Sequence, residues 1–81
     1  MTPTEQKYNG VFCSVFEVNQ SAAKDLSYQG IDEWDSVGHM GLMGELEDSF
    51  EITLEMEDII DFSSYAEGKK ILAKYGVDFN E

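Results

Sequence analysis

The apolar residues of this chain recur three and four positions apart, the spacing that places side chains on one face of an α-helix. One such stripe lies within residues 3–18 and another within 36–50. The first stripe comprises Tyr8, Val11, Phe12, Val15 and Phe16. No long segment alternates between apolar and polar residues, as a half-buried β-strand would. The sequence therefore predicts an all-α fold.

Four helices are expected, and a chain of 81 residues has the size of one domain. Their ranges are about 3–18, 36–50, 55–62 and 64–75. The third helix is short, and the connection from 19 to 34 is long for a loop without structure of its own. Its apolar residues are expected to attach it to the core: Leu26, Tyr28, Ile31 and Trp34. The predicted fold is a small four-helix bundle that spans 1–81.

Capping patterns support the first and the last of these helices. Thr2 lies three positions before Glu5, with Pro3 at the first helical position, and Ser64 lies three positions before Glu67. A hydroxyl at the N-cap with Glu three residues later is the capping-box pattern. For the second helix, either Asp35 or Ser36 is a suitable N-cap.

The charge of the chain is strongly negative. Seventeen Asp and Glu face five Lys and Arg, which gives a net charge of −12 and a pI near 4.1. Phosphate contacts need clustered Lys and Arg, so the charge excludes a nucleic-acid-binding protein and argues against binding to an anionic membrane. Self-repulsion favours a soluble, mostly monomeric molecule, and any partner is expected to be basic.

Cysteine content and the N-terminal sequence indicate a cytoplasmic location. The single cysteine, Cys13, excludes an internal disulfide framework and is expected to be a buried, inert thiol beside the first apolar stripe. No basic segment followed by an apolar run resembles a signal peptide, and no stretch is long and apolar enough to span a membrane.

The second helix has two different faces. The core face is expected to carry Leu42, Met43, Leu46 and Phe50, with His39 among them. The outer face begins with Val37 and Met40, passes over Gly41 and Gly44, and then becomes acidic. From residue 45 to residue 61 there are eight acids and no base. This face is either ordinary solvated surface or a docking surface for a basic partner, and the apolar residues at its start favour docking.

Ser36 is the residue best placed for a chemical modification. Backbone N–H groups and the dipole at a helix start favour an anion, so a phosphate ester on Ser36 would be stabilised there. The alternative is that Ser36 only helps to cap the helix. A Ser36–His39 nucleophile is not supported, since an i, i+3 pair lacks a separately oriented base and oxyanion hole. One Cys and one His do not make a zinc site, and 32–36 does not fit a calcium loop. No catalytic or metal site is predicted.

The residues around Ser36 resemble a known family. Asp35-Ser36-Val37 resembles the Asp-Ser-Leu signature of acyl carrier proteins, and the run Trp-Asp-Ser-Val-Gly-His is similar to that of stand-alone members. The likeness continues through the Leu-Glu-Asp-Ser-Phe-Glu-Ile run at 46–52 and through Ile59, Phe62 and the residues at 63–65. Almost the whole chain can be aligned with the family without a gap.

The resemblance implies a carrier protein, not an enzyme. Ser36 would be joined through a phosphodiester to 4′-phosphopantetheine by a phosphopantetheinyl transferase that uses coenzyme A and Mg²⁺, with Asp35 important for the modification. The thiol of the arm would hold an acyl group as a thioester for acyl-loading and acyl-processing enzymes. The carried-over recognition positions are Val37, Met40, Gly44, Glu45, Glu47 and Asp48.

The resemblance also implies shelter for an apolar acyl chain in the bundle interior. The expected lining is Phe12, Leu42, Leu46, Phe62 and Leu72. Gly38 and His39 differ from the polar pair usual in fatty-acid-synthesis carriers, which favours a specialised biosynthetic pathway over fatty-acid synthesis. The remaining alternative is a non-covalent acidic interaction module without the arm.

Overall fold

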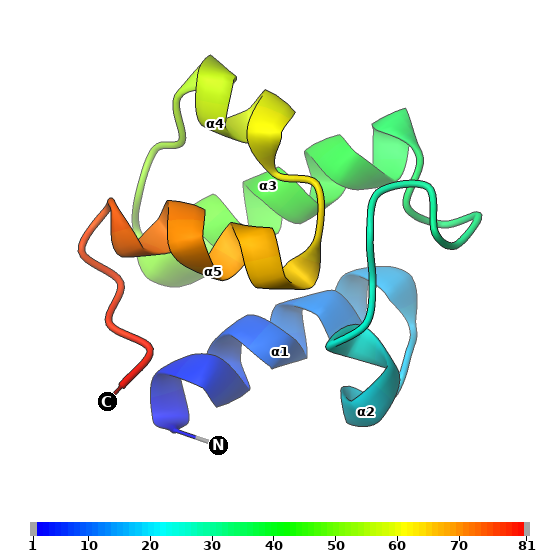
Figure 1. Ribbon diagram of the computed structural model, residues 1–81, viewed down its shortest axis with the longest axis horizontal. Coiled ribbons are helices and arrows are strands. Elements are labelled where there is room, and N and C mark those ends of the chain that lie inside the picture. Colours follow the sequence, from blue (N-terminus) through cyan, green and yellow to red (C-terminus); the bar gives the residue numbers. More distant parts are fainter. Residues whose placement is uncertain (1, 81) are drawn as a thin grey trace.

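Five α-helices form the computed structural model, which describes residues 2–80 (Figure 1). They are α1 (Pro3–Phe16), α2 (Gln20–Ala23), α3 (Ser36–Phe50), α4 (Met56–Asp61) and α5 (Tyr65–Ala73). The predicted helical fold is confirmed, and no β-strand occurs among residues 2–80. The helix count differs from the prediction because α2 lies in the expected loop. The predicted domain begins and ends on Met1 and Glu81, which lie outside the described residues.

The chain between α1 and α2 explains why α1 ends two residues earlier than predicted. Glu17 adopts the left-handed conformation, with φ 54°, which ends α1. Asn19 then caps α2, because its side-chain oxygen accepts a hydrogen bond of 2.8 Å from the Ala22 N–H. With this N-cap side chain a new helix begins at Gln20, four positions after the last residue of α1.

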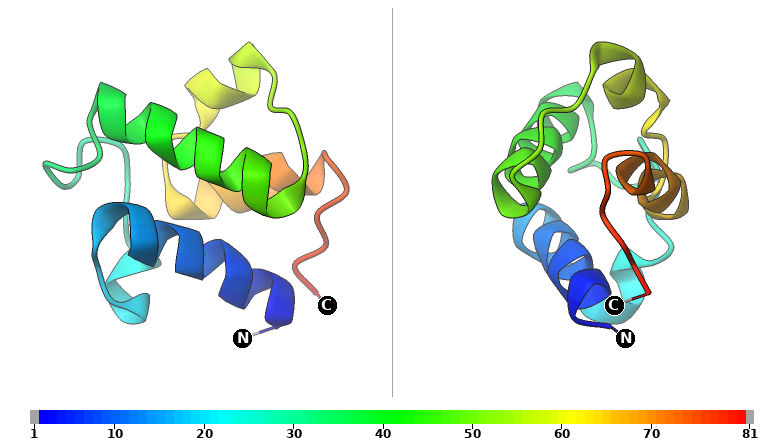
Figure 2. Two further views of the ribbon diagram at one scale, coloured as in Figure 1. Left: turned by 180° about the vertical axis from the view of Figure 1, so that it is seen from behind. Right: turned by 90° about the vertical axis from the view of Figure 1, so that its left-hand side faces the viewer.

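The capping residues predicted for α1 and α5 are confirmed. Thr2 Oγ1 accepts a hydrogen bond from the Glu5 N–H at 3.2 Å, and Ser64 Oγ accepts one from the Glu67 N–H at 3.0 Å. The Thr2 hydroxyl also donates to the Phe79 carbonyl at 3.0 Å, so the two ends of the described chain lie close together (Figures 1 and 2). Each cap satisfies a backbone N–H that the helix itself leaves unpaired.

The longer helices enclose a core rich in aromatic side chains. Helices α1 and α3 pack together and run in opposite directions, while α5 runs in the direction of α3 (Figures 1 and 2). Leu42, Met43 and Leu46 are buried as predicted, whereas His39 and Phe50 are only half-buried. The largest fully buried side chains include Trp34, Tyr8, Phe12 and Phe62.

The connection between α1 and α3 is attached to the segment between α4 and α5. The Tyr28 N–H donates to the Ser63 carbonyl at 2.9 Å, and the Tyr65 N–H donates to the Leu26 carbonyl at 3.0 Å. Leu26 and Trp34 are buried, which confirms that this connection belongs to the core. Tyr28 instead lies at the surface, close to the start of α3.

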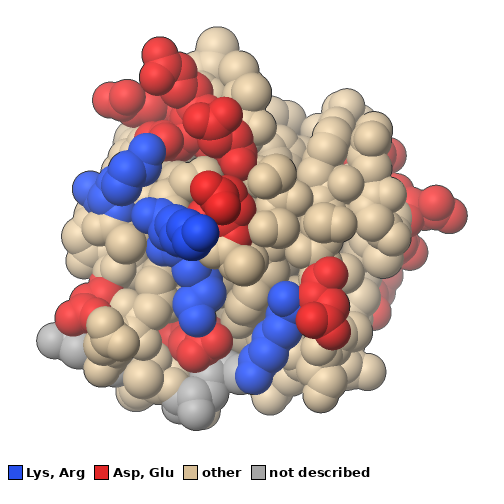
Figure 3. Space-filling view, viewed as in Figure 1, with Lys and Arg blue, Asp and Glu red and all other residues tan. Residues whose placement is uncertain are grey.

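The lysines and the acidic residues occupy different parts of the surface. In Figure 3, lysines gather over α5 and acidic groups gather over α4. The three ion pairs among residues 2–80 are Lys69–Glu5, Lys70–Glu67 and Lys74–Asp58, and none uses a carboxylate of α3. Within that range, no helix is long and apolar enough to cross a bilayer.

Candidate functional site

At the start of α3, one residue caps the helix and the next carries the candidate reactive hydroxyl. Asp35, not Ser36, is the N-cap: its Oδ1 accepts a hydrogen bond of 2.8 Å from the Gly38 N–H. Ser36 is the first residue of the helix, and its side chain is exposed. The hypothesis that Ser36 serves as the cap is therefore wrong. The Ser36 hydroxyl is not needed to begin the helix and is open to a reaction partner.

Gly38 allows the chain to fold tightly around this start. A Cβ on Gly38 would lie 2.0 Å from the Glu33 carbonyl oxygen, which is far inside contact distance. Only a residue without a side chain fits there. The close approach explains why a poor helix former occupies the first turn of α3, next to the exposed Ser36.

Hydrogen bonds of His39 join the start of α3 to Trp34 before the helix and to Ile59 in α4. Its Nδ1 accepts from the Trp34 indole N–H at 2.9 Å, and its Nε2 lies 2.7 Å from the Ile59 carbonyl oxygen. An indole nitrogen only donates and a carbonyl only accepts, so the imidazole carries its proton on Nε2. With both nitrogens engaged, His39 has a structural role, and neither nitrogen is free to act as a base for Ser36.

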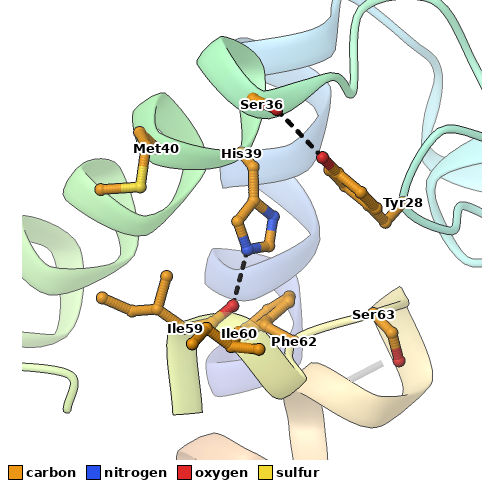
Figure 4. A pocket seen from close by; sticks show the side chains of 8 residues that line it. All are labelled: Tyr28, Ser36, His39, Met40, Ile59, Ile60, Phe62 and Ser63. Carbon is orange, nitrogen blue, oxygen red and sulfur yellow. Dashed lines mark hydrogen bonds between the residues drawn. The ribbon is translucent and has the colours of Figure 1, made fainter. Parts of the chain in front are cut away.

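An apolar cavity of about 390 Å³ opens beside Ser36, between α3 and α4 (Figure 4). Ser36 and Tyr28 lie on one side of it, and the side chains of α4 and of the following segment lie opposite. The Tyr28 hydroxyl is 3.2 Å from Ser36 Oγ. The lining residues are Tyr28, Ser36, His39, Met40, Ile59, Ile60, Phe62 and Ser63.

The predicted interior lining differs from this cavity. Phe12, Leu42, Leu46 and Leu72 have no exposed surface and belong to the close-packed core. Of the five residues expected to shelter an acyl chain, only Phe62 reaches the cavity beside Ser36. The helical periodicity correctly predicted that these apolar residues face inward. It does not show which part of the interior is close-packed and which part is open.

The outer face of α3 is exposed at most of the predicted recognition positions. Val37 is 81% exposed and Met40 is 58% exposed, although both are apolar. Gly44, Glu45 and Asp48 are also exposed. Exposed apolar side chains grouped in this way are typical of interaction surfaces.

Glu47 differs from the other recognition positions. It is half-buried, and its Oε2 accepts a hydrogen bond of 2.8 Å from the Leu54 N–H. This bond ties the segment after α3 back to the helix. Glu47 therefore has a structural task in addition to any contribution to the negative charge of this face.

Helix α4 adds two exposed apolar side chains that were not among the site residues predicted from the sequence. Met56 is 76% exposed and Ile60 is 72% exposed. Ile60 also lines the cavity. Together with Val37 and Met40 they form what we call the apolar rim. The signal that could have identified them is the presence of apolar residues on a short helix of six residues, where a single face packs inward.

The first turn of α4 is held by side chains from the end of α5. Glu55, its N-cap, has no side-chain capping bond; instead the Glu55 N–H donates to the Tyr75 hydroxyl at 2.9 Å. Tyr75 and Lys74 both donate to the Asp58 carboxylate. The hydrogen bond from Lys74 and then the one from Tyr75 lower the pKa of Asp58. This network fixes one end of α4 while the other end borders the cavity.

The remaining reactive side chains do not form a site. Cys13 is half-buried, not fully buried as expected, and its thiol donates to Asn9 Oδ1 at 3.4 Å. Within residues 2–80, no group of three or more His, Cys, Asp or Glu side chains is placed to hold a metal ion. The chemistry that the fold brings together is thus an exposed serine hydroxyl, in contact with the Tyr28 hydroxyl, beside an apolar cavity.

Comparisons with protein-family models, with curated proteins and with solved structures find no match for this chain. The functional interpretation consequently depends on the residues themselves. Ser36 and Asp35 lie together at the start of α3, and the exposed recognition positions follow along the same helix. Tyr28, Ile59 and Ser63 were missed, because they reach the site from other parts of the chain.

Proposed function

We propose that this chain is an acyl carrier protein that bears 4′-phosphopantetheine on Ser36. The observation that carries the proposal is the exposed Ser36 hydroxyl, which Asp35 frees from the capping role, at the mouth of an apolar cavity. When attached, the arm supplies a thiol that holds an acyl group as a thioester. The run of residues around Ser36 favours a specialised biosynthetic pathway, with fatty-acid synthesis as the alternative.

The residues present fit such a group. The attachment residue must reach the active site of a transferase, and Ser36 is exposed at the first turn of a helix of 15 residues. The unpaired N–H groups of that turn favour the negative charge of a phosphodiester. The cavity that begins at Ser36 is lined mainly by apolar side chains, which suits a short acyl group.

In the attachment reaction, Ser36 is a substrate and not a catalyst. Its Oγ forms a bond to the phosphorus nearest the pantetheine of coenzyme A, and the pyrophosphate bond breaks. Adenosine 3′,5′-bisphosphate leaves, and the hydroxyl proton passes to a base of the transferase. This chain needs only to present the hydroxyl, and the exposure of Ser36 does so.

The outer face of α3 and the apolar rim would bind the partner enzymes. Their recognition would combine apolar contacts at Val37 and Met40 with attraction between Glu45, Glu47 and Asp48 and a basic patch. Surface attraction of this kind speeds association but is screened by salt, so the complexes would form quickly and dissociate easily. Such exchange suits a carrier that visits a transferase and several acyl-processing enzymes in turn.

Incubation of the protein with coenzyme A, Mg²⁺ and a broad-specificity phosphopantetheinyl transferase tests the proposal. The attached arm adds about 340 Da, which intact-mass spectrometry resolves easily. We expect this gain in the wild-type protein and none in Ser36→Ala. Absence of the gain in the wild type, or the same gain in Ser36→Ala, would contradict the proposal.

The exposed apolar rim supports a second candidate, a non-covalent interaction module. Val37, Met40, Met56 and Ile60 are all exposed, Met56 and Ile60 adjoin acidic residues in the sequence, and a basic partner with an apolar centre would fit this surface without any arm. The mass of the protein purified from its own cells separates the two candidates. An unmodified mass together with tight binding of a partner favours the module.

A further inference from the structure

The Tyr28 hydroxyl is the polar side-chain group that the fold places against Ser36. Its oxygen lies 3.2 Å from Ser36 Oγ, and either hydroxyl can donate (Figure 4). Tyr28 comes from the connection between α2 and α3, eight residues before Ser36, so this contact is made by the fold and not by the helix. Tyr28 is only 37% exposed despite its place at the surface.

The position of Tyr28 is fixed from three directions. Its backbone N–H donates to the Ser63 carbonyl at 2.9 Å, and the next N–H, that of Gln29, donates to the Trp34 carbonyl at 2.9 Å. Its ring meets the His39 imidazole edge to face, with centroids 5.3 Å apart. A phenol held in this way loses little freedom when it binds a ligand.

A phosphodiester on Ser36 would determine which group donates in the contact between Tyr28 and Ser36. Esterified Oγ has no proton, so only Tyr28 can then donate, and its acceptors become the oxygens of an anion. Hydrogen bonds to ionised acceptors are shorter and stronger than those between neutral groups. No Lys or Arg occurs between Asp25 and Gly68, so the segments that surround Ser36 offer neutral donors only.

We propose that Tyr28 is a positioning residue that donates its hydroxyl to the phosphodiester on Ser36 and holds the start of the arm over the cavity. The inference rests on the proposed function and deepens it, because it names the group that directs the arm toward the cavity. Tyr28 lines that cavity together with Ser36. A held arm places its acyl group against Ile59 and Phe62, away from water.

The test compares the wild type with Tyr28→Phe and with Tyr75→Phe as the matched control. Tyr75→Phe also removes one phenolic hydroxyl, but at the opposite end of α4, where it contacts Asp58 and Glu55. Each protein is loaded with octanoyl-coenzyme A by the transferase, and its mass, phosphorus NMR spectrum and rate of thioester hydrolysis are measured. Circular dichroism verifies that each variant is folded.

For Tyr28→Phe we expect a shifted and narrower phosphorus resonance and thioester hydrolysis at least about tenfold faster than in the wild type, as for the loss of one hydrogen bond to a charged group. Tyr75→Phe should match the wild type in both measurements. Identical spectra and rates for all three loaded proteins would overturn the inference while leaving the proposed function intact. No mass gain in the wild type would contradict both.

A measurement on the wild-type protein alone tests the same contact even if the Tyr28→Phe variant does not fold. With a carbon-13 label at the phenolic carbon of tyrosine, the Tyr28 resonance should move when the arm is attached, because its hydroxyl acquires an anionic acceptor. The Tyr75 resonance should stay in place. An unchanged Tyr28 resonance in the loaded protein would overturn the inference.

Discussion

Ser36 and Ser64 stand at the starts of two helices, and the fold uses them in opposite ways. Ser64 is the N-cap of α5, half-buried, with its hydroxyl oxygen occupied by the Glu67 N–H at 3.0 Å. Ser36 lies one position further into its helix, exposed, because Asp35 provides the cap of α3. A shift of one residue in the cap thus decides whether a serine hydroxyl is structural or available for chemistry.

The surroundings of the two serines differ as well. Behind Ser64, α5 packs so closely that a Cβ on Gly68 would lie 2.1 Å from Phe62 Cζ and 2.3 Å from the Tyr8 hydroxyl. Beside Ser36, by contrast, the fold leaves an open apolar cavity. One helix start is filled to the density of the core, while the other leaves room for a ligand.

Exchange of each serine for alanine gives the largest expected difference between the two sites. Ser36→Ala should abolish attachment of the arm completely, because no other serine or threonine occurs between Tyr28 and Asp48. Ser64→Ala should be modified at the wild-type rate. Intact-mass spectrometry over a time course measures both, and equal loss of modification in the two variants would refute the distinction.

Alanine in the first turns tests how closely each helix start is packed. Gly68→Ala should lower the free energy of unfolding by about 3 kcal/mol, because its Cβ meets buried aromatic rings. Gly38→Ala should lower it by at least about 3 kcal/mol, because its Cβ meets the Glu33 carbonyl, and a backbone carbonyl moves aside less easily than a side chain. Urea unfolding followed by circular dichroism provides the values.

Gly10→Ala is the control for these two substitutions. Gly10 lies in α1, and nothing is within 4 Å of the position where its Cβ would be. Alanine is the better helix former, so this variant should be more stable by about 0.8 kcal/mol. Destabilisation of all three variants by the same amount would show that close packing is not the cause.

Removal of the N-cap side chains of α3 and α5 shows whether Ser36 and Ser64 contribute differently to stability. Asp35→Ala and Ser64→Ala should each cost about 1 kcal/mol of stability, since each leaves a backbone N–H without its partner. Ser36→Ala should change stability by less than about 0.5 kcal/mol, as is usual at exposed positions. Urea unfolding of the three variants, with Asp35→Asn as a variant that retains the cap, tests this order.

The start of α4 is a third helix start to compare. Its expected effect is the smallest, a pH dependence of the stability that Asp58 contributes. Lys74 and Tyr75 lower the pKa of Asp58 below its ordinary 3.8. Because the folded state prefers the charged carboxylate, this stabilisation is complete above about pH 4 and is lost as the pH falls through the lowered value. Melting temperatures of the wild type and Asp58→Asn should therefore converge as the pH falls below about 4.

The order of these melting temperatures provides the check. Above about pH 4 the wild type should melt at the higher temperature, because the neutral amide of the Asp58→Asn variant cannot form the ion pair with Lys74. A constant difference at every pH would mean that Asp58 stabilises α4 through its shape and neutral hydrogen bonds alone.

Much of the helical structure was predictable from local patterns. The N-caps Thr2 and Ser64, the start and end of α3, and the buried stripe of α1 all depend on residues within four positions of one another. The exception, α2, has only four residues, too few for a periodic pattern, and Asn19 was its only local signal. The sequence does not distinguish Asp35 from Ser36 as the cap of α3, because both side chains suit the position.

The sequence by itself determined that the chain is helical, acidic and equipped with a serine at the start of the helix at 36–50, because these features depend on composition and on short-range spacing. Only the tertiary structure decided what surrounds that serine. Tyr28 reaches Ser36 from the preceding connection, and His39 joins Trp34 to the Ile59 carbonyl on a different helix. Contacts between distant segments depend on how the helices pack, and periodicity within one helix does not contain that information.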